Sequence, residues 1–208
     1  MVRRNLMGLM IGALLLSAVS VAWAGVPDMS RSSATTAASV GASVYSLPNG
    51  GGHPVNNCFR LGGQRHNATI TLTLLDVNSN PIFQYPWADL WLDTGDGALV
   101  YCPAGTSADR DTDVLGQTTW SRNLFAGSSG IGTVILVSGN TLTQAPLNIN
   151  HNSPDINGSL LVNLSDVTLF AQDIFGGVYR YRSDFYWDGN LNLSDLVLMS
   201  QGTGAGCP

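Results

Sequence analysis

The chain has 208 residues and a formal net charge of −5, and it contains neither lysine nor glutamate. All of its basic residues are arginines and all of its acidic residues are aspartates, and no basic stripe is present. Because a nucleic-acid-binding protein must neutralise phosphates, this composition excludes a nucleic acid as partner. The low charge density and the many Gly, Ser, Thr and Asn residues are typical of an extracellular β-rich protein.

Residues 1–24 have the pattern of a secretory signal peptide. Two arginines begin it, an apolar stretch runs from Leu6 to Val21, and Ala22-Trp23-Ala24 supplies the small-x-small site of signal peptidase. The apolar stretch is shorter than the roughly 20 residues of a spanning helix, and no stop-transfer charges follow it. We therefore predict cleavage before Gly25, a secreted or cell-surface location, and no membrane span afterwards.

The next part of the chain is predicted to be rich in β-strands. Residues 25–66 contain few periodic patterns, and we predict an N-terminal extension that either stands apart or belongs to the following domain, with one short strand at 42–47. Apolar residues and threonines then alternate from residue 69 to 74, which is the period of a half-buried strand. Further strand-like runs lie at 88–92, 98–101, 117–120 and 133–137, and another begins at 141. Short strands at near-even spacing predict a β-sandwich over residues 67–150.

This stretch also resembles a known family in about 75 residues. The residues that carry the resemblance are Asp76–Ile82, then Ala88–Leu92, then Thr112-Asp113 before Gly116–Thr119. They are similar to bacterial immunoglobulin-like domains of the invasin type. The resemblance implies an immunoglobulin-like sandwich that acts as a spacer or adhesive unit and not as a catalyst.

Cysteine and histidine usage gives weaker indications. Export permits a disulfide, and we predict a bond between Cys58 and Cys102, which leaves Cys207 free or paired with another chain. The three cysteines lie too far apart in sequence for the closely spaced ligands of a zinc site. The three histidines are scattered and are predicted to be solvated loop residues.

The strongest signal is an internal repeat of twelve residues. We call Asp155–Asp166 loop one and Asp184–Asp195 loop two. Each begins and ends with aspartate, both close with Asn-Leu-Ser-Asp, and they are offset by 29 residues.

The spacing of oxygen-bearing residues in both loops is that of a calcium loop. Calcium takes six to eight oxygen ligands, and a twelve-residue loop supplies them from positions 1, 3, 5, 7, 9 and 12. In loop one these positions are Asp155, Asn157, Ser159, the carbonyl of Leu161, Asn163 and Asp166. In loop two they are Asp184, Tyr186, Asp188, the carbonyl of Asn190, Asn192 and Asp195.

A helix is predicted after each loop. Val167, Leu169, Phe170 and Ile174 form an apolar face between Asp166 and Phe175, before the stop signal Gly176-Gly177. Leu196, Leu198 and Met199 form a shorter face after loop two. A calcium loop followed by one helix, and duplicated, resembles the dockerin family over nearly all of residues 153–201. The resemblance implies a small α-helical module at 151–208, two bound calcium ions and a cohesin-type domain as partner.

Three features depart from the family pattern. Glycine stands at position 4 of loop one (Gly158), whereas position 6, where the tight turn usually has glycine, is Leu160. Tyr186 at position 3 of loop two has no carboxylate or amide, so a carbonyl or water must replace its ligand. The basic residues that often follow position 12 are absent. With so few carboxylates, we expect dissociation constants on the order of 10⁻⁴ to 10⁻³ M.

These patterns favour a secreted, non-catalytic calcium-binding protein that attaches to another protein, or to the cell surface, through its dockerin-like module. One alternative is a structural subunit of a calcium-stabilised fibre or sheath, which would use self-association. Another is an accessory protein or an enzyme in polysaccharide degradation. Glycoside hydrolysis needs paired carboxylates in a cleft, for which the Gly-rich β region leaves little room, and no Gly-x-Ser-x-Gly elbow occurs.

Overall fold

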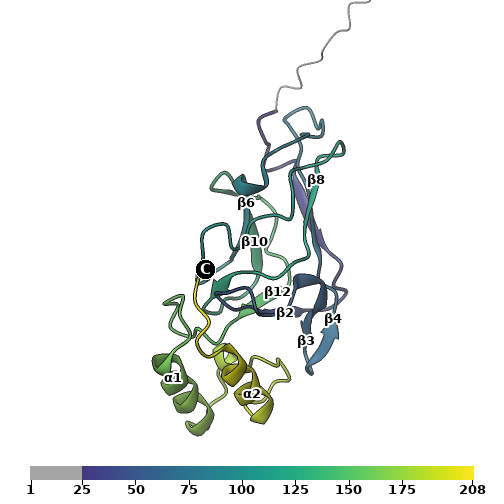
Figure 1. Ribbon diagram of the computed structural model, residues 1–208. Coiled ribbons are helices and arrows are strands. Elements are labelled where there is room, and N and C mark those ends of the chain that lie inside the picture. Colours follow the sequence, from purple (N-terminus) through teal and green to yellow (C-terminus); the bar gives the residue numbers. More distant parts are fainter. Residues whose placement is uncertain (1–24) are drawn as a thin grey trace, which may run out of the picture.

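A computed structural model describes residues 25–208, so the predicted signal peptide lies outside the described residues. The protein consists mostly of β-sheets, with two α-helices at one end (Figure 1). This confirms the predicted class, mainly β with a small helical part. In the described part of the chain, no helix is both long enough and apolar enough to cross a lipid bilayer.

Two three-stranded antiparallel sheets take their strands from residues 33–141. The first has the order β1-β5-β8, with bounds Ser33–Thr36, Ile70–Thr73 and Gln117–Trp120. The second has the order β11-β10-β6, with bounds Asn140–Thr141, Thr133–Val137 and Leu90–Thr94. Strands β5, β6 and β10 alternate buried and half-buried residues, as the sequence predicts. Their buried residues join one apolar core, an arrangement consistent with a β-sandwich.

A third sheet has four strands and joins distant parts of the chain. Its order is β12-β2-β3-β4, with bounds Ile149–Asn152, Ala42–Tyr45, Cys58–Arg60 and Gln64–His66. Strands β2 and β12 pair in parallel, from Ala42 opposite Ile149 to Tyr45 opposite Asn152. The predicted boundary between residues 150 and 151 therefore falls inside β12. The short strands β7 (Val100–Tyr101) and β9 (Ala126–Gly127) form a separate pair.

The region at 25–66 contains more strands than its sequence indicates. The strand predicted at 42–47 is β2, and β1, β3 and β4 lie in the same region. Strand β1 reads Ser-Ala-Thr-Thr, and β3 and β4 have three residues each, so none shows a clear alternation. Because β1 pairs with β5, this region is joined to the sandwich.

The two α-helices pack on the four-stranded sheet through a second apolar core. Helix α1 spans Leu164–Phe175, helix α2 spans Leu193–Gly202, and they lie together at the foot of Figure 1. Tyr45 of β2, Leu47 just after β2 and Phe59 of β3 share this core with residues of the loops and helices. The rings of Phe170 and Phe185 stack at its centre, with centroids 5.6 Å apart. The loop–helix segment is thus not a separate body, because it completes its core with residues of the β region.

Helix ends follow local sequence signals. Asn163 and Asn192 cap α1 and α2, and each helix starts with a capping box closed by the loop's last aspartate. Helix α1 ends at Phe175, before the predicted stop at Gly176-Gly177. In α2 the predicted apolar face is only partly buried, since Leu198 and Met199 are buried whereas Leu196 is 45% exposed.

The predicted disulfide is wrong. Cys102 bonds to Cys207, and Cys58 is a free, buried cysteine of β3 whose Sγ lies 3.4 Å from the carbonyl oxygen of His66. After α2 the chain turns back toward the β region (Figure 1), which brings Cys207 to the end of β7. Sequence position gave no sign of this return.

The prediction of solvated histidines is wrong for His151. This residue lies in β12, is fully buried, and places Nε2 2.8 Å from Oγ1 of Thr133. Burial lowers the pKa of its imidazole to about 4, which keeps the ring neutral.

Candidate metal centre

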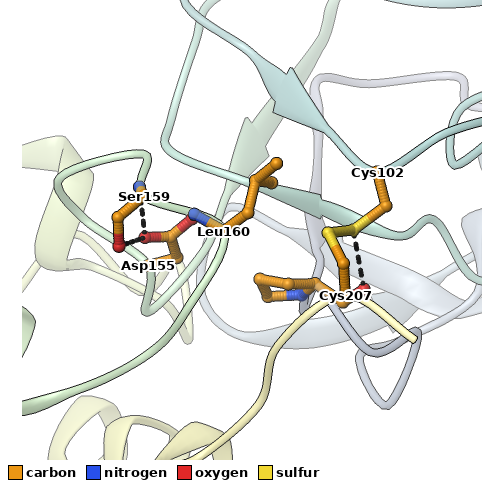
Figure 2. Close-up of a disulfide and its surroundings, with 6 residues drawn as sticks. Cys102, Asp155, Ser159, Leu160 and Cys207 are labelled. Atoms are coloured by element: carbon orange, nitrogen blue, oxygen red, sulfur yellow. Dashed lines mark hydrogen bonds between the residues drawn. A yellow bond between two sulfur atoms is a disulfide. The ribbon is translucent and has the colours of Figure 1, made fainter.

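The first and last carboxylates of loop one are buried and organise the loop backbone. Asp155 accepts the N–H groups of Ser159 at 2.9 Å and Leu160 at 2.8 Å, one at each carboxylate oxygen (Figure 2). Asp166 accepts the N–H groups of Asn157 at 3.1 Å and Asn163 at 2.9 Å. Positions 1 and 12 therefore each bind two backbone amides of the loop.

Loop two repeats this scheme position by position. Asp184 accepts the N–H groups of Asp188 at 3.1 Å and Gly189 at 3.0 Å. Asp195 accepts the N–H groups of Tyr186 at 2.9 Å and Asn192 at 3.0 Å. In both loops, position 1 holds positions 5 and 6, and position 12 holds positions 3 and 9. The internal repeat in the sequence is thus a repeat of structure.

The displaced glycine of loop one is explained by the backbone. Both loops use positive φ at positions 4 and 6: +70° and +61° at Gly158 and Leu160, and +52° and +86° at Trp187 and Gly189. Each loop has glycine at one of the two left-handed positions and a larger residue at the other. The turn requires two residues with positive φ. In each loop only one of the two has a side chain, so the steric cost of the left-handed conformation arises once per loop.

The predicted ligands of loop one converge. Oγ of Ser159 lies 3.4 Å from Oδ1 of Asp155 and 3.1 Å from the carbonyl oxygen of Leu161. The amide of Asn163 donates to the same carbonyl at 3.1 Å. Positions 1, 5, 7 and 9 therefore present their polar groups to one another. Asn157 at position 3 accepts the N–H of Ser159 at 2.9 Å.

Loop two joins positions 5, 7 and 9 by hydrogen bonds and turns one predicted ligand away. The amide of Asn192 donates to Oδ2 of Asp188 at 2.9 Å, and Oδ1 of Asp188 accepts the N–H of Asn190. The ring of Tyr186 instead packs against Phe59, with centroids 5.0 Å apart. Position 3 thus contributes its backbone N–H to the loop while its side chain joins the second core.

Electrostatics disfavour the ionised form of three loop carboxylates, those of Asp155, Asp184 and Asp195. Burial raises the pKa of Asp155 and of Asp184, although the N–H bonds that each accepts oppose the shift. Burial raises the pKa of Asp195 to about 6, and the neighbouring Asp184 and Asp188 add to the rise. Within residues 25–208, the ion pairs of arginine involve other aspartates (Asp28, Asp109 and Asp173). The loop carboxylates therefore have no cationic partner there.

The donor set fits calcium better than a transition metal. Carboxylate, amide, hydroxyl and carbonyl oxygens are the ligands of a hard cation, and a cation would offset the unpaired buried charge. Among the described residues, no three His, Cys, Asp or Glu side chains converge as a metal-binding group. An ion in either loop would therefore take part of its coordination from Asn or Ser side chains, main-chain carbonyls or water.

Two residues that the sequence did not single out contact the loop carboxylates. The hydroxyl of Tyr179 donates to Oδ2 of Asp184 at 2.8 Å. The backbone of Gly127, in β9, lies against the carboxylate of Asp155, so closely that a Cβ there would overlap it. Tyr179 precedes loop two by five residues but carries no motif, and Gly127 lies 28 residues before Asp155 in another sheet.

Comparison with known proteins identifies no family for this chain. No protein-family model matches this chain, and no curated protein matches it. Among solved structures, the crystal structure of the Lin-41 filamin domain is similar to 59% of this chain and 95% of its own, with 15% identity and a TM-score of 0.31.

Proposed function

We propose that this chain is an exported, non-catalytic protein that binds two calcium ions, one in each loop, and that its loop–helix pair attaches it to another protein. One observation carries the calcium proposal. The two loops share one hydrogen-bond scheme around buried aspartates at positions 1 and 12, and these aspartates have no cationic partner in the described part of the chain. When bound, calcium supplies the missing positive charge and ties the loop to the start of its helix.

The exposed apolar residues of the helices support a docking role. Leu164 and Leu193 both occupy position 10 of their loops, and they are 77% and 70% exposed. Leu196 and Val197 of α2 are exposed as well. Such a repeated apolar surface fits a protein partner, for which the dockerin resemblance suggests a cohesin-type domain. Self-association is the rival use, and light scattering in calcium distinguishes the two because docking to another protein leaves this chain monomeric.

We also infer that the β-sandwich is of the immunoglobulin-like, invasin type and serves as a spacer. Its support is the pair of three-stranded antiparallel sheets around one core. The free cysteine does not favour the fibre alternative, because Cys58 is buried and thus poorly placed to cross-link chains.

Calorimetric titration of the purified protein with calcium tests the proposal. We expect two sites with dissociation constants on the order of 10⁻⁴ to 10⁻³ M. Asp155→Asn should remove one site and Asp184→Asn the other. Asp113→Asn is the matched control, because Oδ1 of Asp113 also organises a turn, by accepting two N–H groups, but lies outside both loops. No saturable binding by the parent, or unchanged binding in both loop variants, would refute the calcium proposal.

A further inference from the structure

The C-terminal tail, defined as Thr203–Cys207, pairs with loop one at positions 7 and 8. The N–H of Val162 donates to the carbonyl oxygen of Ala205 at 2.8 Å, and the N–H of Gly204 donates to that of Val162 at 2.9 Å. Leu161 and Gly206 form an antiparallel β-bridge. These contacts fix the peptide that carries the Leu161 carbonyl, the predicted ligand at position 7.

The disulfide attaches this tail to the β region. Cys207 bonds to Cys102, which directly follows β7 (Figure 2). Strand β7 pairs with β9, and the N–H of Cys102 donates to the carbonyl oxygen of Phe125, just before β9. Because Gly127 of β9 lies against Asp155, the β7–β9 pair supports loop one at two places. It contacts position 1 directly and holds position 7 through the disulfide and the tail.

Loop two is supported by other parts of the chain. The side-chain amide of Asn152 donates to the carbonyl oxygen of Asp184 at 2.9 Å. The N–H groups of Gly62 and Gly63 donate to the carbonyl oxygen of Trp187 at 2.9 and 3.2 Å. Within residues 25–208, no hydrogen bond joins the tail to loop two.

We propose that the Cys102–Cys207 disulfide and the tail are positioning elements for the calcium site of loop one, and of loop one alone. This inference rests on the proposed calcium function. Residues that hold ligands in place typically change metal affinity by about 10- to 100-fold when they are removed. Without the disulfide, the tail is free to leave loop one, and the Leu161 carbonyl loses its fixed direction. Loop two keeps its own supports.

The test compares the two loops separately, by calorimetric titration with calcium. The disulfide is removed by the double substitution Cys102→Ser and Cys207→Ser. In one protein this double substitution is combined with Asp184→Asn, so that only loop one binds calcium. In a second protein it is combined with Asp155→Asn, so that only loop two binds calcium. We expect loop one to lose about 10- to 100-fold in affinity and loop two to change less than twofold. Cys58→Ala is the matched control, because it removes a cysteine and leaves the disulfide intact.

The double serine variant could fail to fold, in which case loop two would also lose calcium binding and the circular dichroism spectrum would change. A second variant keeps the test decisive in that case. Gly204→Val retains both cysteines and places a β-branched residue at a φ of +87°, which strains the tail where its N–H bonds to the carbonyl oxygen of Val162. It should weaken loop one selectively as well. Unchanged affinity of loop one, or equal weakening of both loops in a folded variant, would overturn the inference. Absence of calcium binding in the parent would instead reject the proposed function itself.

Discussion

The phenol of Tyr45 donates a hydrogen bond of 2.8 Å to the carbonyl oxygen of Leu198, 153 residues later in the chain. The bond is buried and joins β2 to α2, so it crosses between the β region and the helices. The same contact region includes Leu47 and Phe59, which complete the core of the helices.

We predict from this contact that the β region and the helices unfold together. Tyr45→Phe removes this buried hydrogen bond between the two parts, which should cost about 1 kcal/mol in free energy of unfolding. Differential scanning calorimetry should show one transition that moves as a whole to lower temperature. Tyr85→Phe serves as control, because the Tyr85 hydroxyl bonds to Ser138 in an exposed setting. Two separate transitions, with only one of them shifted, would contradict the shared core.

Gly127→Ala should weaken calcium binding by loop one. The added methyl group overlaps the carboxylate of Asp155 and must push position 1 out of place. We expect an affinity loss of about tenfold or more at loop one, as for other groups that hold a metal ligand in place. Calorimetry in the Asp184→Asn background measures it. Gly95→Ala is the control, because Gly95 lies outside both loops and a Cβ there would meet only ordinary van der Waals contacts, the nearest at 3.4 Å. An equal loss in both variants would show that the effect is not local.

Loss of the Asn192 cap should destabilise α2. The side-chain oxygen of Asn192 accepts the N–H of Ser194 at 2.7 Å, and no other side chain replaces that bond. Asn192→Ala should therefore lower the free energy of unfolding by about 1 kcal/mol, and Asn192→Ser should restore most of it. Urea unfolding without calcium, which separates capping from ion binding, is the measurement. Asn190→Ala, at an exposed loop position, is expected to change stability much less.

His151 should make the protein less stable in acid. Burial lowers the pKa of His151 to about 4 in the folded protein, below the value near 6.5 of an unfolded chain. The unfolded state therefore binds a proton between pH 6.5 and 4 while the folded state does not, so stability falls as the pH is lowered through this window. The loss approaches about 3 kcal/mol, at roughly 1.4 kcal/mol per pKa unit.

His151→Gln removes the titrating group and can keep a hydrogen bond to Thr133. As the pH falls from 6.5 to 4, the parent should therefore lose more free energy of unfolding than the variant does. His66→Gln is the control, because His66 is only half-buried, at the end of the otherwise exposed edge strand β4. A difference that does not vary with pH would rule out this role for His151.

Local patterns predicted much of this structure from the sequence. The alternation at 69–74 predicted β5, and the apolar residues after each loop predicted a helix there, because strand and helix faces depend on neighbours a few residues apart. The helices begin at Leu164 and Leu193, ahead of those apolar residues. The structure also groups the polar atoms of positions 1, 5, 7 and 9 of loop one, whereas calcium binding by this loop stays a prediction.

Features that depend on distant contacts could not be predicted in this way. The Cys102–Cys207 bond requires the chain to turn back after α2, and the burial of His151 requires β12 to lie beside β2. Nor does the sequence of loop two show that the Tyr186 ring packs on Phe59. In each case the deciding partner lies more than 90 residues away in the sequence.

The parallel pairing of β2 with β12 also bears on how fast the protein folds. Strand β2 forms near the start of the described chain but gains its β12 neighbour only when residues 149–152 arrive, and Tyr45 gains its Leu198 partner later still. Such a topology has a high contact order, and folding rates fall as contact order rises. Until β12 docks, one edge of β2 is open to pairing with other chains. We therefore expect slow refolding that is prone to aggregation at high protein concentration.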